Sequence, residues 1–226
     1  MNNAIKRILN KDIKEIAKIN LNSHGIYIHF NEDNFLEAKA MIVGPKDSLY
    51  EGGFLFFEIK FPKNYPFAPP SLKYISQNNV RIHPNMYVNG KVCLSILGTW
   101  SGPKWTSIMD ITTILLTIQS LLDNNPLYHE PGQENNKSEM NQNYNEIIRY
   151  NTISSLMINN YKNIPYGYDI FKDDMKLILL KYKDSINQKL DELKEKETYN
   201  ISLSFYRINV TINYKKLFID YKELIN

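Results

Sequence analysis

The chain has 226 residues, of which 43% are hydrophobic and 23% are charged. This composition is typical of a globular protein and excludes a disordered chain. The length suits either one domain with an extension or two small domains. The net charge of +3 is too small to favour nucleic acid as a partner. The single cysteine, Cys93, excludes an intrachain disulfide, so we expect a reducing compartment, the cytoplasm or the nucleus.

No segment predicts secretion or membrane insertion. Residues 1–7 lack the apolar core of a signal peptide. The longest apolar run, 111–122, contains polar residues and is too short to cross a bilayer. We therefore expect a soluble intracellular protein with no membrane partner. The four histidines and one cysteine lack metal-ligand spacing, so we expect no metal site.

The first predicted element is an amphipathic helix near the N-terminus. Its apolar residues recur at helical spacing, and they are Ile5, Ile8, Leu9, Ile13, Ile16 and Ile19. Basic residues lie between them, namely Lys6, Arg7, Lys11, Lys14 and Lys18. A basic face of this kind is most often simply solvated.

Four short strands are expected next, joined as an antiparallel meander. Alternating β-branched and aromatic residues, interrupted by glycine and proline, predict strands at 25–30, 36–43, 54–61 and 71–75. The prolines of 62–70 predict a stiff extended loop, since proline cannot donate a hydrogen bond within a central strand.

The second half of the chain is mostly helical in pattern. Residues 81–105 have no periodicity but many apolar side chains, which is typical of a functional loop. A helical stripe at 108–122 follows and should end before Pro126. The tail from 143 has helical periodicity, except that 201–214 fits a helix and a strand equally well.

The motif that carries chemistry is His83-Pro84-Asn85, followed eight residues after the asparagine by Cys93-Leu94. A lone cysteine is most often a small buried apolar residue, and a lone asparagine is common in turns. In this order and spacing, however, the residues resemble the active-site signature of the ubiquitin-conjugating enzyme family. Further segments fit that family in the same order, namely Gly44-Pro45, Tyr50–Gly53, Phe61–Pro70, Ile118–Leu122 and Tyr144 with Arg149.

The resemblance implies an α+β fold with an N-terminal helix, a four-stranded antiparallel meander sheet, a long active-site loop and C-terminal helices. We expect a catalytic core at 1–163 and a mostly helical extension at 164–226. Trp105 lies twelve residues after Cys93, where ordinary members have eight. The longer loop and the extension resemble the larger Use1-type members, which implies possible use of a second, ubiquitin-like modifier.

The family chemistry is acyl transfer through a cysteine thioester. Cys93 would accept ubiquitin or a ubiquitin-like modifier from an activating enzyme, and then pass it to a substrate lysine or a ligase cysteine. A thiolate both attacks and leaves well, so the chain needs no metal or cofactor, and ATP is used by the activating enzyme. The mechanism requires an exposed Cys93 thiol.

The neighbouring motif residues have roles that the resemblance implies. The family counterpart of Asn85 stabilises the oxyanion of the transition state, although Asn85 could equally brace the loop through backbone bonds. We interpret His83 as a buried structural residue and Pro84 as the residue that sets the turn.

The chain departs from the family where the attacking lysine is usually assisted. Ser95 and Asn125 stand where many members have acidic or gating residues. Asp123, His129 and Glu130 are nearby candidates for the same role. Lysine reactivity is therefore the open question, and transfer to a cysteine-type ligase would tolerate the change.

Two partner surfaces are implied by alignment with the family. Lys6, Arg7, Lys11 and Lys14 correspond to the helix that meets the acidic domain of the activating enzyme. Phe67, Thr106, Ser107 and Ile108 correspond to ligase contacts. Without the resemblance, Phe67 would be interpreted as a core aromatic, and Trp105 is expected in the core rather than in a contact.

Two other protein classes compete with the enzyme. A catalytically silent binding module of the same fold is the main alternative, although such variants lack the cysteine. An unrelated cysteine hydrolase would need a histidine base, and His83 has no evident orienting carboxylate.

Overall fold

The computed structural model describes residues 2–225, which divide into two units. Unit 1 comprises residues 2–43, 55–76 and 85–121, and unit 2 comprises residues 44–54, 77–84 and 122–225. Met1 and Asn226, the ends of the two predicted domains, lie outside the described residues. The boundary expected after residue 163 stays a prediction.

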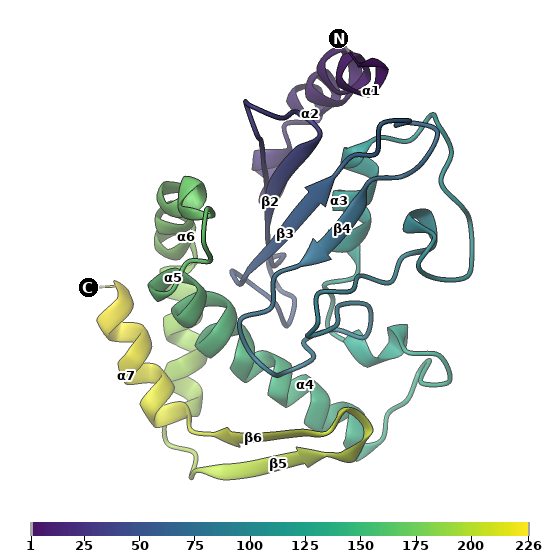
Figure 1. Ribbon diagram of the computed structural model, residues 1–226. Helices are drawn as coiled ribbons and strands as arrows, with labels where there is room; N and C mark the ends of the chain where they lie inside the picture. Colours follow the sequence, from purple (N-terminus) through teal and green to yellow (C-terminus); the bar gives the residue numbers. More distant parts are fainter. Residues whose placement is uncertain (1, 226) are drawn as a thin grey trace. The chain divides into compact units, whose positions relative to one another are not determined.

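The predicted N-terminal helix is present as three consecutive pieces (Figure 1). These are α1 (Asn3–Arg7), a π-helical turn (Ile8–Asp12) and α2 (Ile13–Ile19). Asn2 caps the first piece, since its side chain accepts a hydrogen bond from the Ala4 N–H at 2.9 Å. Ile8 is buried and Lys6 and Lys14 are exposed, so the helix is amphipathic as expected.

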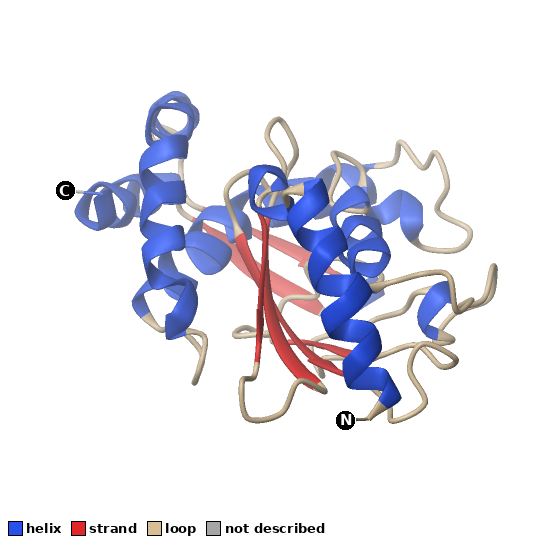
Figure 2. Ribbon diagram, turned by 90° about the horizontal axis from the view of Figure 1, so that it is seen from above, coloured by secondary structure: helices blue, strands red, loops and turns tan. Residues whose placement is uncertain are grey.

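Four antiparallel strands form the sheet, in the order of the chain. Strands are drawn in red in Figure 2. They are β1 (Ile26–Phe30), β2 (Glu37–Val43), β3 (Phe54–Lys60) and β4 (Ser71–Tyr74). The meander prediction is confirmed, and each strand lies within one residue of its expected bounds. Helix α3 (Ile111–Ser120) contacts β2 and buries Ile114, Leu115 and Ile118. It starts later than expected because the Asp110 side chain caps it by accepting from the Thr113 N–H at 3.2 Å.

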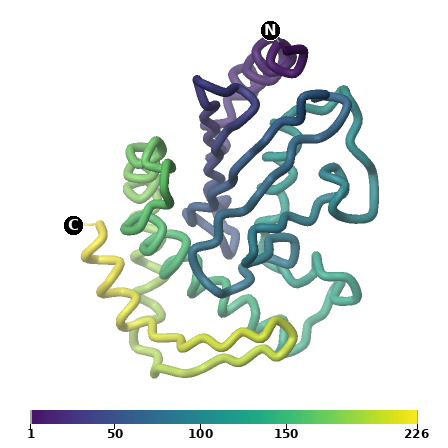
Figure 3. The backbone as a smooth tube through the Cα atoms, in the orientation of Figure 1, coloured from purple at the N-terminus to yellow at the C-terminus, as the bar shows by residue number. Residues whose placement is uncertain are grey.

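Unit 2 is built mainly from helices and a hairpin. The helices are α4 (Glu139–Asn151), a π-helical segment (Thr152–Asn159), α5 (Asn160–Lys162), α6 (Lys172–Leu193) and α7 (Tyr214–Ile225). Strands β5 (Tyr199–Leu203) and β6 (Ile208–Ile212) pair antiparallel and lie along α4, as Figure 3 shows. The ambiguous stretch after residue 200 is thus a hairpin followed by a helix, and its buried residues alternate as strand residues do.

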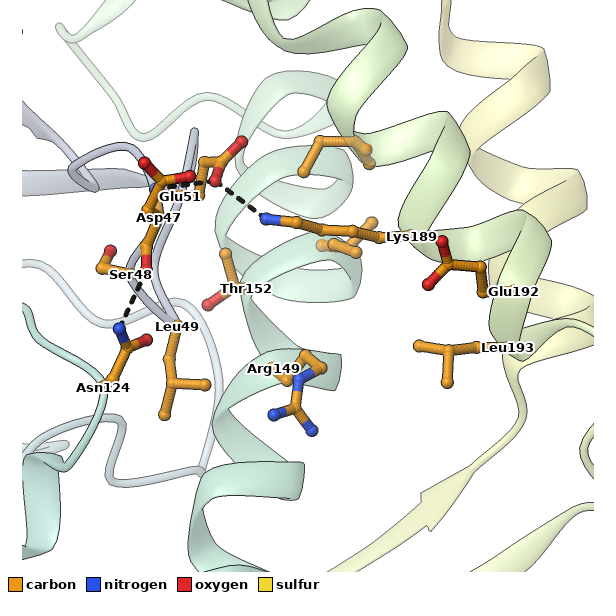
Figure 4. Close-up of a pocket in the computed structure, with 12 residues that line it drawn as sticks. Asp47, Ser48, Leu49, Glu51, Asn124, Arg149, Thr152, Lys189, Glu192 and Leu193 are labelled. Carbon is orange, nitrogen blue, oxygen red and sulfur yellow. Dashed lines mark hydrogen bonds and ion pairs between the residues drawn. The ribbon is translucent and has the colours of Figure 1, made fainter.

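An ion pair between Glu51, which is buried, and Lys189, which is partly exposed, connects α6 to the loop that follows β2 (Figure 4). The Glu51 carboxylate is 2% exposed and accepts hydrogen bonds from Lys189 Nζ at 2.8 Å, Ser185 Oγ at 2.6 Å and the Asp47 N–H at 2.8 Å. Burial alone would raise the pKa of Glu51, but these three donors together hold it below its usual value. The pair lines a pocket that also contains Arg149 and Thr152.

Across residues 2–225, no helix is both long enough and apolar enough to span a membrane.

Candidate active site

The spacing of Asn85 and Cys93 is explained by a tight hairpin-like turn in unit 1. Met86 and Val92 form an antiparallel bridge, and the Gly90 N–H donates to the Tyr87 carbonyl oxygen at 2.9 Å. Asn85 and Cys93 are the next pair outward, and the Cys93 N–H donates to the Asn85 carbonyl oxygen at 2.9 Å. The eight-residue interval therefore places these two residues opposite one another.

Gly90 fixes this turn against β4. The Tyr74 N–H donates to the Gly90 carbonyl oxygen at 2.9 Å, and Lys73 forms a bridge with Lys91. Gly90 has a φ of +92°, and a Cβ atom there would lie 2.9 Å from the Tyr74 carbonyl oxygen. Only glycine tolerates both conditions, so Gly90 lets the turn that carries Asn85 and Cys93 pack directly on the sheet.

The Asn85 carboxamide braces the backbone of the cysteine. Its Nδ2 atom donates to the Cys93 carbonyl oxygen at 2.7 Å. This is the loop-bracing arrangement that the sequence left open beside an oxyanion role. A carboxamide has two N–H donors, so this bond does not preclude donation to a second oxygen.

The expectation of an exposed thiol is wrong for this structure, because Cys93 is only 1% exposed. Thr99, in the extended loop, bonds to the backbone on either side of the cysteine, since its Oγ1 accepts from the Leu94 N–H at 2.9 Å and donates to the Val92 carbonyl oxygen at 2.7 Å. Thr99 thus binds the residues on both sides of Cys93. The loop also folds back at Gly102, where a Cβ atom would lie 3.0 Å from Ser95 Cβ.

His83 and Pro84 belong to unit 2, as do the four residues proposed to assist the attacking lysine, here called the lysine-gate candidates. These are Asp123, Asn125, His129 and Glu130. His83 is fully buried, and its ring centroid lies 6.2 Å from that of Tyr50 and 5.1 Å from that of His129. Pro84 is also buried. This environment suits the structural interpretation of both residues, whose roles stay predictions.

Three of the gate candidates are bonded to one another. The Asp123 carboxylate accepts from His129 Nε2 at 2.9 Å and from the Asn125 N–H at 2.8 Å. Burial would raise the pKa of Asp123, but these two hydrogen bonds and the charge of His129 outweigh it and lower the pKa. Asp123 is therefore an anion at neutral pH that orients the His129 ring.

Glu130 is held by residues that the sequence did not single out. Its Oε2 atom accepts from the Tyr206 hydroxyl at 2.6 Å and lies 3.7 Å from Arg81 Nη2. Tyr206 lies in the β5–β6 turn, 76 residues further along the chain. No local sequence pattern points to such a contact.

The predicted ligase contacts gather on one part of unit 1. Phe67 is 81% exposed and Ile108 is 78% exposed, and Thr106 and Ser107 are exposed as well. Interpretation of Phe67 as a core aromatic is thus wrong. Trp105, which is half-buried rather than fully in the core, donates through Nε1 to the Pro66 carbonyl oxygen at 2.7 Å and so joins the two loops.

The basic helix lies against the second of these loops. Arg7 donates to the Met109 carbonyl oxygen at 2.9 Å, and Lys11 donates to the Ile108 carbonyl oxygen at 2.8 Å. Lys6 and Lys14 are exposed. The predicted activating-enzyme contacts therefore include two residues that support the loop and two that face solvent.

One buried carboxyl group was missed by the sequence analysis. Asp12 is fully buried and accepts hydrogen bonds from the Tyr65 hydroxyl and, at 3.1 Å, from the Ile111 N–H. Burial raises the pKa of Asp12 despite these bonds and the nearby Arg7. The available signal was its position, since Asp12 interrupts the apolar face of the first helix.

No group of three or more histidine, cysteine, aspartate or glutamate side chains that could hold a metal ion occurs in the part of the chain that the structure describes.

Comparison with known proteins places the chain in a family. The sequence model described as "Ubiquitin-conjugating enzyme" matches residues 8–153, more than half of the chain. A Plasmodium yoelii crystal structure, provisionally titled a ubiquitin conjugating enzyme, is 33% identical and covers 54% of this chain and 73% of its own, with a TM-score of 0.45. That TM-score is too low to carry an argument about the fold.

Curated relatives support the same assignment. Ubiquitin-conjugating enzyme E2 Z of Xenopus tropicalis is 45% identical over 132 residues, covering 57% of this chain and 42% of the relative. The Homo sapiens protein of the same name is also 45% identical over 132 residues, covering 57% of this chain and 37% of the relative. The Homo sapiens dual E2 ubiquitin-conjugating enzyme/E3 ubiquitin-protein ligase BIRC6 is 33% identical over 153 residues, or 62% of this chain and 3% of that protein. The chain spans less than half the length of these relatives, and the match across residues 8–153 establishes that it belongs to the ubiquitin-conjugating enzyme family.

Proposed function

We propose that the chain is an acyltransferase that carries ubiquitin, or a ubiquitin-like modifier, as a thioester on Cys93. The observation that carries this proposal is the pairing of Asn85 with Cys93 across a hydrogen-bonded turn, within a region that matches the family. The Cys93 sulfur would attack the carbonyl carbon of the modifier's thioester on the activating enzyme. A new carbon–sulfur bond forms, and the activating enzyme's thiolate leaves.

The second step transfers the acyl group to a nucleophile. A substrate lysine amine or a ligase thiol attacks the same carbonyl carbon, and the Cys93 thiolate leaves. The carbonyl oxygen becomes negative in the transition state, and the Asn85 carboxamide would stabilise it by donating a hydrogen bond. Loss of one such donor typically costs about 3 kcal/mol of transition-state stabilisation.

The buried thiol adds a requirement to this mechanism. A side chain that is 1% exposed cannot meet another protein's thioester, so Cys93 has to become exposed before charging. We propose that the loop containing Thr99, which bonds on both sides of Cys93, opens to expose the thiol. We retain Asp123, His129, Glu130 and Asn125 as the groups that assist the lysine, whose unperturbed pKa of about 10.4 makes it a poor nucleophile at neutral pH.

The proposed partners follow from the reaction. They are ubiquitin or a ubiquitin-like modifier, an activating enzyme at the basic helix, a ligase at Phe67 and Ile108, and protein substrates. We propose that the chain itself uses no cofactor, since ATP is used by the activating enzyme, and that it works in the cytoplasm or nucleus. The relation to Use1-type members and the use of a second modifier remain proposals.

A charging assay tests the proposed function. The protein is mixed with activating enzyme, ATP and ubiquitin, and the products are separated on gels with and without reducing agent. We expect an adduct that reducing agent removes and that Cys93→Ala abolishes. No adduct with any modifier would support the silent binding module instead, and modifier release without an adduct would support a hydrolase.

A further inference from the structure

We propose that Tyr206, in the turn of the C-terminal hairpin, is a positioning residue for transfer to lysine. The inference rests on the proposed function and deepens it, because it assigns a role in the second step to the segment after the catalytic core. Tyr206 would act on Glu130 and Arg81, and through them on the segments that carry the lysine-gate candidates.

The first contact is a hydrogen bond to a charged group. Tyr206 ends the helical turn Ser204–Tyr206 between β5 and β6, and Arg207 reverses the chain there with a φ of +53°. The Tyr206 hydroxyl donates to Glu130 Oε2 at 2.6 Å. A bond this short to a carboxylate is of the strong, charge-assisted kind.

The second contact is with Arg81, which links Tyr206 to the active-site motif. The guanidinium carbon of Arg81 lies 4.6 Å from the centroid of the Tyr206 ring, within the range of a cation–π interaction. Arg81 also donates through Nη2 to the Pro84 carbonyl oxygen. Its side chain is 17% exposed and that of Glu130 is 23% exposed, so both groups are largely shielded from solvent.

Tyr144 fixes this arrangement from α4. Its hydroxyl donates to the Arg81 carbonyl oxygen at 2.8 Å, and its ring centroid lies 5.4 Å from that of Tyr206. Tyr144 is fully buried, so the network is attached to the interior of unit 2. The Tyr206 side chain is therefore held against the interior of unit 2.

Glu130 is connected to the other three lysine-gate candidates through the backbone and through hydrogen bonds. Glu130 is the residue after His129, and His129 is bonded to Asp123, which in turn holds the Asn125 N–H. Tyr206 thus anchors one end of a connected set that contains all four candidates. The same network holds the Pro84 carbonyl group, one residue before Asn85.

The test is Tyr206→Phe, compared with Tyr199→Phe as a matched control. Tyr199 belongs to the same hairpin, and its hydroxyl also donates to a carboxylate at 2.6 Å, but the acceptor is Glu146 on α4. Each change removes one oxygen atom and one charge-assisted hydrogen bond. Charging of Cys93, discharge to free cysteine and discharge to free lysine are measured for both variants, together with their melting temperatures.

We expect Tyr206→Phe to slow discharge to lysine about tenfold at neutral pH, the factor typical of losing one hydrogen bond to a charged group. Charging and discharge to cysteine should not change, because a thiol does not need the assistance that an amine needs. The lysine defect should shrink as the pH approaches the lysine pKa of about 10.4, where the amine is deprotonated without help. Tyr199→Phe should leave all three rates unchanged.

A double-mutant cycle tests whether Tyr206 acts through Glu130. When Glu130 is already changed to Ala, adding Tyr206→Phe should slow lysine discharge less than about twofold, because the acceptor of the Tyr206 hydrogen bond has gone. Equal slowing of cysteine and lysine discharge, or equal effects of the two tyrosine changes, would overturn the positioning role. Failure of the wild type to charge would instead refute the proposed function.

Discussion

Replacing Lys189 with methionine should destabilise unit 2 strongly, because it leaves the Glu51 carboxylate buried without its cation. Glu51 is 2% exposed, and Lys189 Nζ lies 2.8 Å from it. Methionine keeps most of the aliphatic stem of lysine, so packing changes little. The change therefore removes the positive charge of Lys189 with little effect on packing.

The magnitude follows from what remains around Glu51. Removing one partner of a buried ion pair typically costs about 3–5 kcal/mol. Lys189 is itself 42% exposed, and Ser185 and the Asp47 N–H still donate to the carboxylate. We therefore expect a loss of about 2–3 kcal/mol in the free energy of unfolding at neutral pH.

The loss should depend on pH with a defined sign. In the wild type, hydrogen bonds hold the pKa of Glu51 below its usual value despite burial. This carboxylate therefore contributes stability above the unfolded-state pKa of about 4.3, and the contribution is lost as the pH falls through the lower folded-state pKa. Without Lys189, burial raises that pKa, so the deficit of the variant should shrink below about pH 4.

The assay is denaturant unfolding followed by circular dichroism at neutral and at acidic pH. Lys194→Met is the control, since Lys194 pairs at 2.6 Å with Asp191, a residue of the same unit that is 62% exposed. An exposed pair contributes about 0–1 kcal/mol, so the control should lose little. Two outcomes would refute the claim that burial of Glu51 determines how much its ion pair with Lys189 stabilises unit 2. One is an equal loss of stability in the two variants, and the other is a loss in Lys189→Met that does not change with pH.

Three further predictions concern the active site and its partner surface. Thr99→Val removes the hydroxyl that bonds on both sides of Cys93, so a thiol reagent should label Cys93 several-fold faster, and unchanged labelling would show that Thr99 does not restrain access. Asn85→Ala should slow lysine discharge about 100-fold, and a change below about threefold would restrict Asn85 to loop bracing. Phe67→Ala should weaken ligase binding in a pull-down at least tenfold while Cys93 charging is retained, because this 81% exposed ring is a single large anchor.

The elements that sequence predicted well are those defined by local chemistry. The strand at Phe54–Lys60 could be located because a short run of aromatic and aliphatic residues lies between Gly53 and Pro62. The helical periodicity expected in the tail corresponds in α6 to the buried stripe that includes Ile178, Tyr182 and Ile186. The eight-residue interval between Asn85 and Cys93 was informative because it places the two residues opposite one another across one short turn.

The features that sequence missed depend on contacts between distant segments. The spacing of the motif indicates neither the burial of Cys93 nor the bonds of Thr99 on either side of it. Nothing near Glu130 indicates that Tyr206 reaches it from the hairpin. Asp12 lies on an apolar helix face, and its partner Tyr65 belongs to the proline-rich loop.

The account depends most on whether the Cys93 sulfur is the atom that takes the modifier. The direct measurement is the intact mass of wild type and Cys93→Ser after incubation with activating enzyme, ATP and ubiquitin. We predict that each protein gains the mass of one ubiquitin, as a thioester that dithiothreitol removes from the wild type and as an oxyester that resists dithiothreitol in the serine variant. A wild-type mass that never changes, or an adduct on the wild type that withstands dithiothreitol, would contradict the account.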